Sequence, residues 1–112
     1  MGKFEEKIEQ YQNEMIKLGI SYNAVILTAV AKDLGPSIYK TDAETVSSSD
    51  ESELETVKKN FLIKKLGLKD SPKLDEAIQN VIEKVGTSNR NKYRAIVYYL
   101  LVKELNQESQ YI

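Results

Sequence analysis

Four of the five glycines follow an apolar residue that closes a run of apolar side chains spaced three or four apart. Such spacing places the apolar side chains on one face of an α-helix. Glycine readily adopts the left-handed conformation in which many helices end. The sequence therefore predicts four helix ends, at Leu18-Gly19, Leu34-Gly35, Leu66-Gly67 and Val85-Gly86.

The apolar spacing and these ends divide the chain into five main helices. The first helix carries one apolar stripe, formed by Phe4, Ile8, Tyr11, Met15 and Leu18. We expect helices over residues 3–18, 22–34, 50–66 and 72–85, and a last helix that begins after Ser88 or Asn89 and runs to about residue 105.

Capping signals support several of the helix starts. Glu53 follows Asp50 at the spacing of a capping box. Ser71-Pro72 joins a favoured cap to a residue that prefers the first helical position. The residues from Thr41 to Glu44 repeat the capping-box spacing, so a single helical turn is expected near residues 42–47.

Residues 95–102 are apolar on every side of the predicted last helix. A helix of this kind is packed on most of its faces, so we expect it to be the central one. The run is far shorter than the roughly 20 residues that cross a bilayer. The predicted fold is all-α: a compact single-domain bundle covering residues 1–112, with about five helices and one short helical turn.

The composition removes several kinds of chemistry. The chain has no cysteine and no histidine, which excludes disulfides, thiolate metal sites and imidazole-based catalysis. Its net charge of −1 gives no overall attraction to nucleic acid or membranes. We expect a non-enzymatic protein with no catalytic residue, metal site or cofactor. The first residues lack the apolar core of a secretory signal, so a cytoplasmic location is expected.

Three stretches of the chain have a specific sequence: Leu34-Gly35-Pro36-Ser37-Ile38-Tyr39, Val57-Lys58-Lys59-Asn60-Phe61-Leu62-Ile63-Lys64-Lys65-Leu66-Gly67-Leu68 and Ser88-Asn89-Arg90-Asn91-Lys92-Tyr93-Arg94-Ala95. They resemble a bacterial family known only as domain of unknown function 2853, and the likeness covers nearly the whole chain. The resemblance implies a small helical protein without an assigned activity, and it assigns no functional residue.

The segment before the last predicted helix has an unusual charge pattern. Three cations lie near the helix N-terminus, where the helix dipole disfavours positive charge, and no acid occurs between Glu83 and Glu104. Free backbone N–H groups at such an end also attract anions. The candidate anion- or partner-binding residues are Ser88, Asn89, Arg90, Lys92 and Arg94.

Three explanations for these cations remain open. The favoured one is internal pairing with the acid-rich segment 42–55. The second is an external phosphate, carboxylate or acidic partner, and the third is that the cations have no role. Arg90 and Arg94 are four residues apart, so on one helix they lie on the same face and would share an acidic group.

Six lysines lie between residues 58 and 73, in a segment that resembles a helix-turn-helix in its layout. The second helix of that pair carries Asp75, Glu76 and Glu83, which repel phosphates, so nucleic-acid binding is not favoured. The acid-rich segment 42–55 lacks the spacing of a Ca²⁺ loop, and we interpret it as a solvated face. The lysines are Lys58, Lys59, Lys64, Lys65, Lys69 and Lys73.

The leading hypothesis is a protein that acts by association, with itself or with another protein. Its support is the lack of a nucleophile–base pair, a phosphate loop or a metal-ligand set. The alternative is an anion- or phosphate-binding protein that uses residues 88–94. A weaker alternative is a DNA-associated regulator that uses the lysines of residues 58–73.

Overall fold

The computed structural model describes residues 2–40, 44–47, 50–89 and 92–111. The regular elements of this part of the chain are helical: α1 (Lys3–Lys17), α2 (Ala24–Leu34), α3 (Glu51–Thr56), α4 (Pro72–Val85) and α5 (Arg94–Glu104). Two short 3₁₀ turns, η1 (Gly35–Tyr39) and η3 (Glu108–Tyr111), and a π-helical segment, η2 (Val57–Lys65), complete them. The all-α prediction is confirmed.

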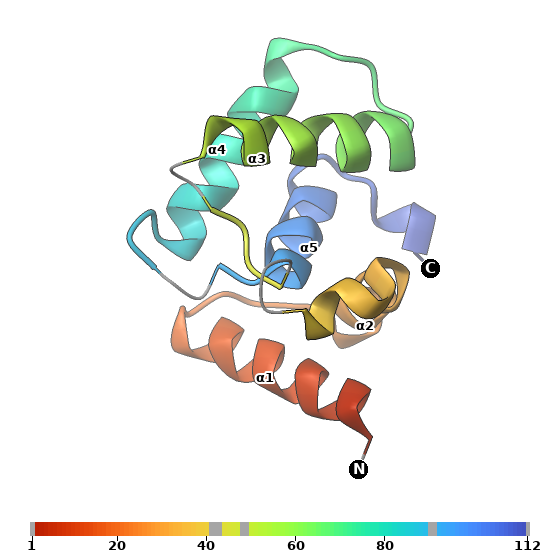
Figure 1. The fold of residues 1–112 in the computed structure, drawn as a ribbon, viewed down its shortest axis with the longest axis vertical. Helices are drawn as coiled ribbons and strands as arrows, with labels where there is room; N and C mark the ends of the chain where they lie inside the picture. The colour runs from red at the N-terminus through yellow and green to blue at the C-terminus, as the bar shows by residue number, and fades with distance from the viewer. Residues whose placement is uncertain (1, 41–43, 48–49, 90–91, 112) are drawn as a thin grey trace.

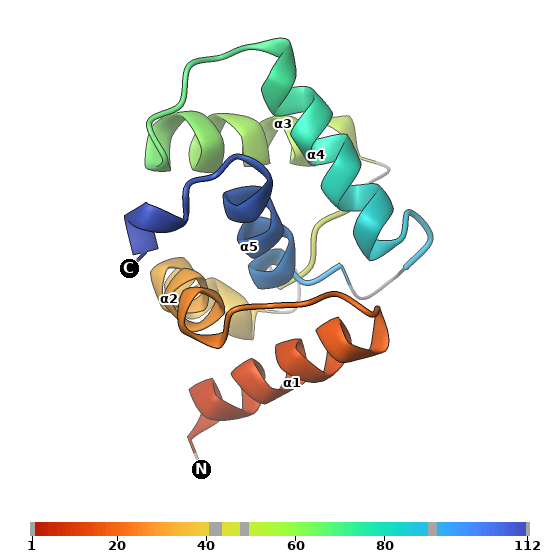
Figure 2. The same cartoon turned by 180° about the vertical axis from the view of Figure 1, so that it is seen from behind.

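Helix α5 lies at the centre of the molecule, as its apolar sequence predicts. All eight residues from Ala95 to Val102 are buried. Figures 1 and 2 show α5 surrounded by α1 and α2 on one side and by α3 and α4 on the other. Helices α1, α2 and α4 each bury apolar residues in a common core, whereas α3 has no buried residue of its own.

Helix α1 forms one end of the molecule (Figure 1). Tyr11 and Met15 of its predicted stripe are fully buried, while Phe4 and Ile8 are only half-buried. The helix ends at Lys17, and Gly19 just beyond it has φ +70°, the left-handed conformation that the sequence predicts. The amides of Gly19 and Ile20 donate to the carbonyls of Ile16 and Met15, which satisfies the last turn.

Helix α2 begins at Ala24, two residues later than predicted. Asn23 is the reason, because its side-chain oxygen accepts hydrogen bonds from the amides of Val25 (2.9 Å) and Ile26 (3.3 Å). The amide of Asn23 itself donates to the hydroxyl of the buried Tyr99 at 2.7 Å, which ties this cap to α5.

The third predicted helix is two different helices in succession. Asp50 caps α3 as expected, but after Thr56 the chain becomes π-helical, with the amide of Leu66 bonded to the carbonyl of Phe61. The buried residues Val57, Phe61 and Leu66 are four and five apart, a spacing that the wider i→i+5 turn accommodates. Sequence periodicity near 3.6 did not separate these two geometries.

The helical turn expected near residues 42–47 falls partly outside the described residues, and its described part, 44–47, is not helical. Thr45 instead forms an isolated antiparallel bridge with Tyr93. The amide of Val46 donates to the carbonyl of Lys92 (2.8 Å), and the amide of Arg94 donates to the carbonyl of Glu44 (2.7 Å). These long-range bonds bury Val46, which a solvated local turn would not do.

Two other helix starts differ in detail from the prediction. Helix α5 begins at Arg94 rather than after Ser88 or Asn89, because Lys92 and Tyr93 take part in the bridge. At α4, Pro72 occupies the first position as predicted, but the Ser71 side chain makes no capping hydrogen bond.

Candidate functional site

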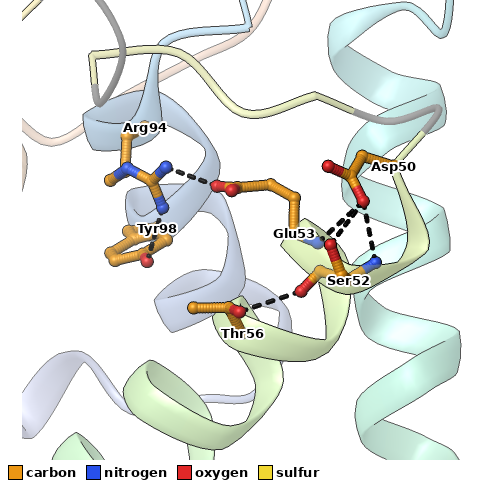
Figure 3. Close-up of polar contacts among 6 residues, drawn as sticks. All are labelled: Asp50, Ser52, Glu53, Thr56, Arg94 and Tyr98. Atoms are coloured by element: carbon orange, nitrogen blue, oxygen red, sulfur yellow. Dashed lines mark hydrogen bonds and ion pairs between the residues drawn. The ribbon is translucent and has the colours of Figure 1, made fainter.

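Arg94 holds the start of α5 against the start of α3. Its guanidinium forms an ion pair with Glu53 and donates a second hydrogen bond to the hydroxyl of Tyr98 at 3.0 Å. The ring of Tyr98 stacks on Phe61 with centroids 4.0 Å apart. Figure 3 shows the guanidinium of Arg94 reaching both Glu53 and Tyr98. The expected internal pairing of Arg94 with the acid-rich segment 42–55 is thereby confirmed.

The surroundings of this pair shift the pKa values of Arg94 and Tyr98. Burial lowers the pKa of Arg94, but the hydrogen bond to Glu53 and the contact with Tyr98 raise it more, so the net pKa lies above its ordinary value. Burial raises the pKa of Tyr98, and the Arg94 charge opposes that rise. The guanidinium therefore stays charged, and its charge is taken up inside the fold.

Glu53 is used differently from the prediction. Its carboxylate is turned toward Arg94 and so serves a long-range ion pair in place of a capping box. Asp50 caps α3 through its Oδ1, which accepts from the amides of Ser52 (3.0 Å) and Glu53 (3.4 Å), as Figure 3 shows. These hydrogen bonds, together with one from the Ser52 hydroxyl, hold the pKa of Asp50 below its ordinary value.

The other described candidates of segment 88–94, which are Ser88, Asn89 and Lys92, have different surroundings. Lys92 is buried, and its ammonium donates to the carbonyl of Asn89. The side-chain Nδ2 of Asn89 donates to the carboxylate of Glu14 (3.3 Å) and to the backbone carbonyl of Val85 (3.0 Å). Ser88 is exposed, and Arg90 lies outside the described residues. The expected one-turn relation between Arg90 and Arg94 therefore also lies outside the described residues; α5 begins at Arg94.

Helix α1 contributes polar contacts to this region that sequence reasoning missed. Lys7 pairs with Glu44 at 2.5 Å, and Gln10 donates to the hydroxyl of Tyr93 at 2.9 Å. Tyr11 is fully buried against the Tyr93 ring, and within the described residues its hydroxyl has no hydrogen-bond partner. Burial, followed by the nearby Glu44 charge, raises the pKa of Tyr11. Local sequence patterns do not predict contacts between residues so far apart in the chain.

Several lysines of residues 58–73 are paired internally. Lys58 is buried and bridges Asp70 (2.9 Å) and Asp75 (3.2 Å), and these hydrogen bonds raise its pKa. Lys65 pairs with Asp33 of α2 at 2.9 Å. The predicted basic patch is therefore partly neutralised by neighbouring acids, which lowers its capacity for phosphate contacts.

Apolar side chains are exposed on the surface between α1 and α2. A hollow of about 650 Å³ separates the two helices, with Phe4 and Ile8 among its lining residues. Ile16 is 65% exposed and Val25 is 66% exposed. Ile16 follows the lining residue Gln12 by four positions, and Val25 precedes the lining Thr28 by three, so both extend the lined faces. We call this surface the α1–α2 groove; it comprises Phe4, Glu5, Ile8, Glu9, Gln12, Ile16, Val25, Thr28 and Lys32.

Among the described residues, no group of three or more acidic side chains is placed to hold a metal ion. None of the helices in the described part of the chain combines the length and the apolar character needed to cross a membrane.

A family model described as "Protein of unknown function (DUF2853)" matches residues 9–109 of the chain. No curated protein matches the chain. The match covers most of the chain and agrees with the resemblance carried by the three sequence stretches. The chain belongs to the DUF2853 family.

Proposed function

We propose that this protein is non-enzymatic, is located in the cytoplasm and acts by association, and that its partner at the α1–α2 groove is a second copy of the same chain. The observations that carry the proposal are the exposure of Ile16 and Val25, about two-thirds each, and the hollow lined by Phe4 and Ile8. Helical spacing places Ile16 and Val25 on the faces of α1 and α2 that line this hollow. Contiguous apolar surface with a polar rim is typical of protein-binding sites.

The charges along the groove support a second copy as the partner. Glu9 lies on the α1 side and Lys32 on the α2 side, and no ion pair joins them or any other partner within the described residues. In a two-fold dimer the same patch meets itself, so Glu9 of each copy faces Lys32 of the other. The groove thus carries both halves of a reciprocal pair.

The alternatives have less support. Anion binding by residues 88–94 is less favoured because Arg94 is paired with Glu53 and Lys92 is buried. DNA binding by residues 58–73 is less favoured because Lys58 and Lys65 are paired with acids of the same chain. Both stay hypotheses that a titration with phosphate or with duplex DNA tests.

Sedimentation equilibrium over about 10 µM to 1 mM protein tests the proposal, since that range covers weak association. We expect a reversible monomer–dimer equilibrium. Ile16→Ser and Val25→Ser are each expected to weaken it by about tenfold, because exposed apolar anchors carry much of such an interface. Tyr39→Ser is the matched control: Tyr39 is also an exposed large apolar residue, but it lies outside the groove, and its loss leaves the equilibrium unchanged.

A charge swap tests the reciprocal pairing. Glu9→Lys or Lys32→Glu alone places like charges together and weakens the dimer, whereas the double variant restores opposite charges and recovers association. A chain that stays monomeric at every concentration contradicts the second copy as partner. Equal effects of the groove variants and Tyr39→Ser contradict the groove as the interface.

A further inference from the structure

A second hollow, of about 570 Å³, is lined by residues of α4, α5 and the loop after α1. Figure 2 shows the course of these three segments. Its apolar lining comes from all three segments: Leu18 and Ile20 from the loop, Val81 from α4 and Leu100 from α5. We call it the α4–α5 hollow. Its volume falls within the range of small-molecule sites, which are apolar with a few polar groups at defined places.

The polar side chains around this hollow are not used in contacts within the described part of the fold. Ser21, Asn80, Lys84 and Lys103 line it, and none of them has a hydrogen-bond or ion-pair partner in the described part of the chain. Glu104 also lines it. Elsewhere several charged groups are paired, as Lys58 is with Asp70 and Asp75. The hollow therefore combines the partly exposed apolar side chains of Leu18 and Ile20 with hydrogen-bond donors that remain available to a ligand.

We propose that the α4–α5 hollow binds a small carboxylic acid with an apolar body, the carboxylate lying between Lys84 and Lys103 and the body against the partly exposed Leu18 and Ile20. The proposal is independent of self-association, because the hollow and the α1–α2 groove share no residue.

The charge balance selects this class of ligand. Two lysines and one glutamate leave one net positive charge at the rim, which matches a singly charged carboxylate better than a doubly charged phosphate. The lysines also lie in the last turns of α4 and α5, where the helix dipole alone would repel an anion. Binding should therefore depend strongly on both lysines.

Methyl NMR with octanoate as the probe tests the site. We expect saturable shifts at Leu18, Ile20, Val81 and Leu100, with a Kd of about 1 mM, in keeping with the affinity available to a ligand of about ten heavy atoms. The double variant Lys84→Ala/Lys103→Ala should weaken binding by about tenfold or more. It removes both cations, and the negative ends of the α4 and α5 dipoles that remain repel the carboxylate.

Two controls separate the carboxylate site from general apolar binding. Lys73→Ala removes an exposed lysine in the first turn of α4, away from the hollow, and should leave the affinity unchanged. Octanol and octylammonium carry the same chain without the negative charge and should bind at least tenfold more weakly than octanoate.

Three outcomes overturn the proposal. They are the absence of saturable shifts up to about 10 mM octanoate, equal binding of octylammonium or octanol, and unchanged affinity in the double-lysine variant. Because the measurement is made on residues outside the α1–α2 groove, its failure leaves the association proposal standing, and failure of the dimer leaves this one standing.

Discussion

The ion pair between Arg94 and Glu53 joins the first residue of α5 to the first turn of α3 across 41 positions of sequence. Arg94 sits where the dipole of α5 disfavours a cation, and Glu53 supplies the compensating charge. Their side chains are only 13% and 27% exposed, so solvent screens the pair less than a surface contact. The pair therefore belongs to the framework of the fold.

Replacing Arg94 by Ala should lower the free energy of unfolding by about 2 kcal/mol, as expected for hydrogen bonds to charged groups. A double-mutant cycle with Glu53→Ala isolates the pair, with an expected coupling of about 1 kcal/mol or more in urea denaturation. The Lys59–Glu55 pair, at 3.7 Å on an exposed helix face, is the control, with a coupling of about 0.5 kcal/mol or less. Equal coupling in the two cycles would mean that the Arg94 pair is solvated.

Tyr11→Phe should leave stability unchanged or raise it, because the substitution removes a buried hydroxyl that has no partner within the described residues. Tyr99→Phe is the matched control. Tyr99 is equally buried, but its hydroxyl accepts a hydrogen bond from the amide of Asn23, so its loss should cost about 1 kcal/mol or more. Thermal unfolding of the two variants checks the contrast, and a larger loss for Tyr11→Phe would contradict it.

Leu100→Ala should lower the free energy of unfolding by about 2–5 kcal/mol, as deletion of a buried leucine usually does. The measurement is urea denaturation followed by circular dichroism. Ile16→Ala is the control, because Ile16 is exposed and its change should be within about 0.5 kcal/mol. A loss below about 1 kcal/mol for Leu100→Ala would show that the centre of α5 is less well packed than the structure indicates.

Asp50 should make stability depend on pH in acid. Hydrogen bonds from Ser52 and Glu53 lower its pKa in the folded state, so the folded chain releases this proton more readily than the unfolded one. The resulting stabilisation is complete above the unfolded pKa of about 4 and is lost as pH falls through the lower folded value. Asp50→Asn keeps a capping oxygen but does not titrate, so its unfolding free energy should fall less between pH 5 and pH 2 than that of the wild type, given an ordinary pKa near ~4. Parallel curves for the two proteins would contradict this account.

Local chemistry determined the helices and their ends. Gly19, Gly35, Gly67 and Gly86 all have positive φ, as the apolar-glycine pattern predicts, and Asp50 caps α3 as its position indicates. The burial of residues 95–102 also follows from sequence, because a helix that is apolar on every side has no face for solvent. These features depend on neighbours within one or two helical turns.

Only the tertiary structure decided how the helices meet. The bridge between Thr45 and Tyr93 replaced an expected helical turn and delayed the start of α5 to Arg94. The same contact drew Lys92 inward, while Glu53 gave up its local cap for Arg94. In each case a local preference of about 1 kcal/mol is outweighed by the burial and hydrogen bonds gained across the fold. Such gains depend on residues 40 or more positions apart, which the local sequence pattern does not record.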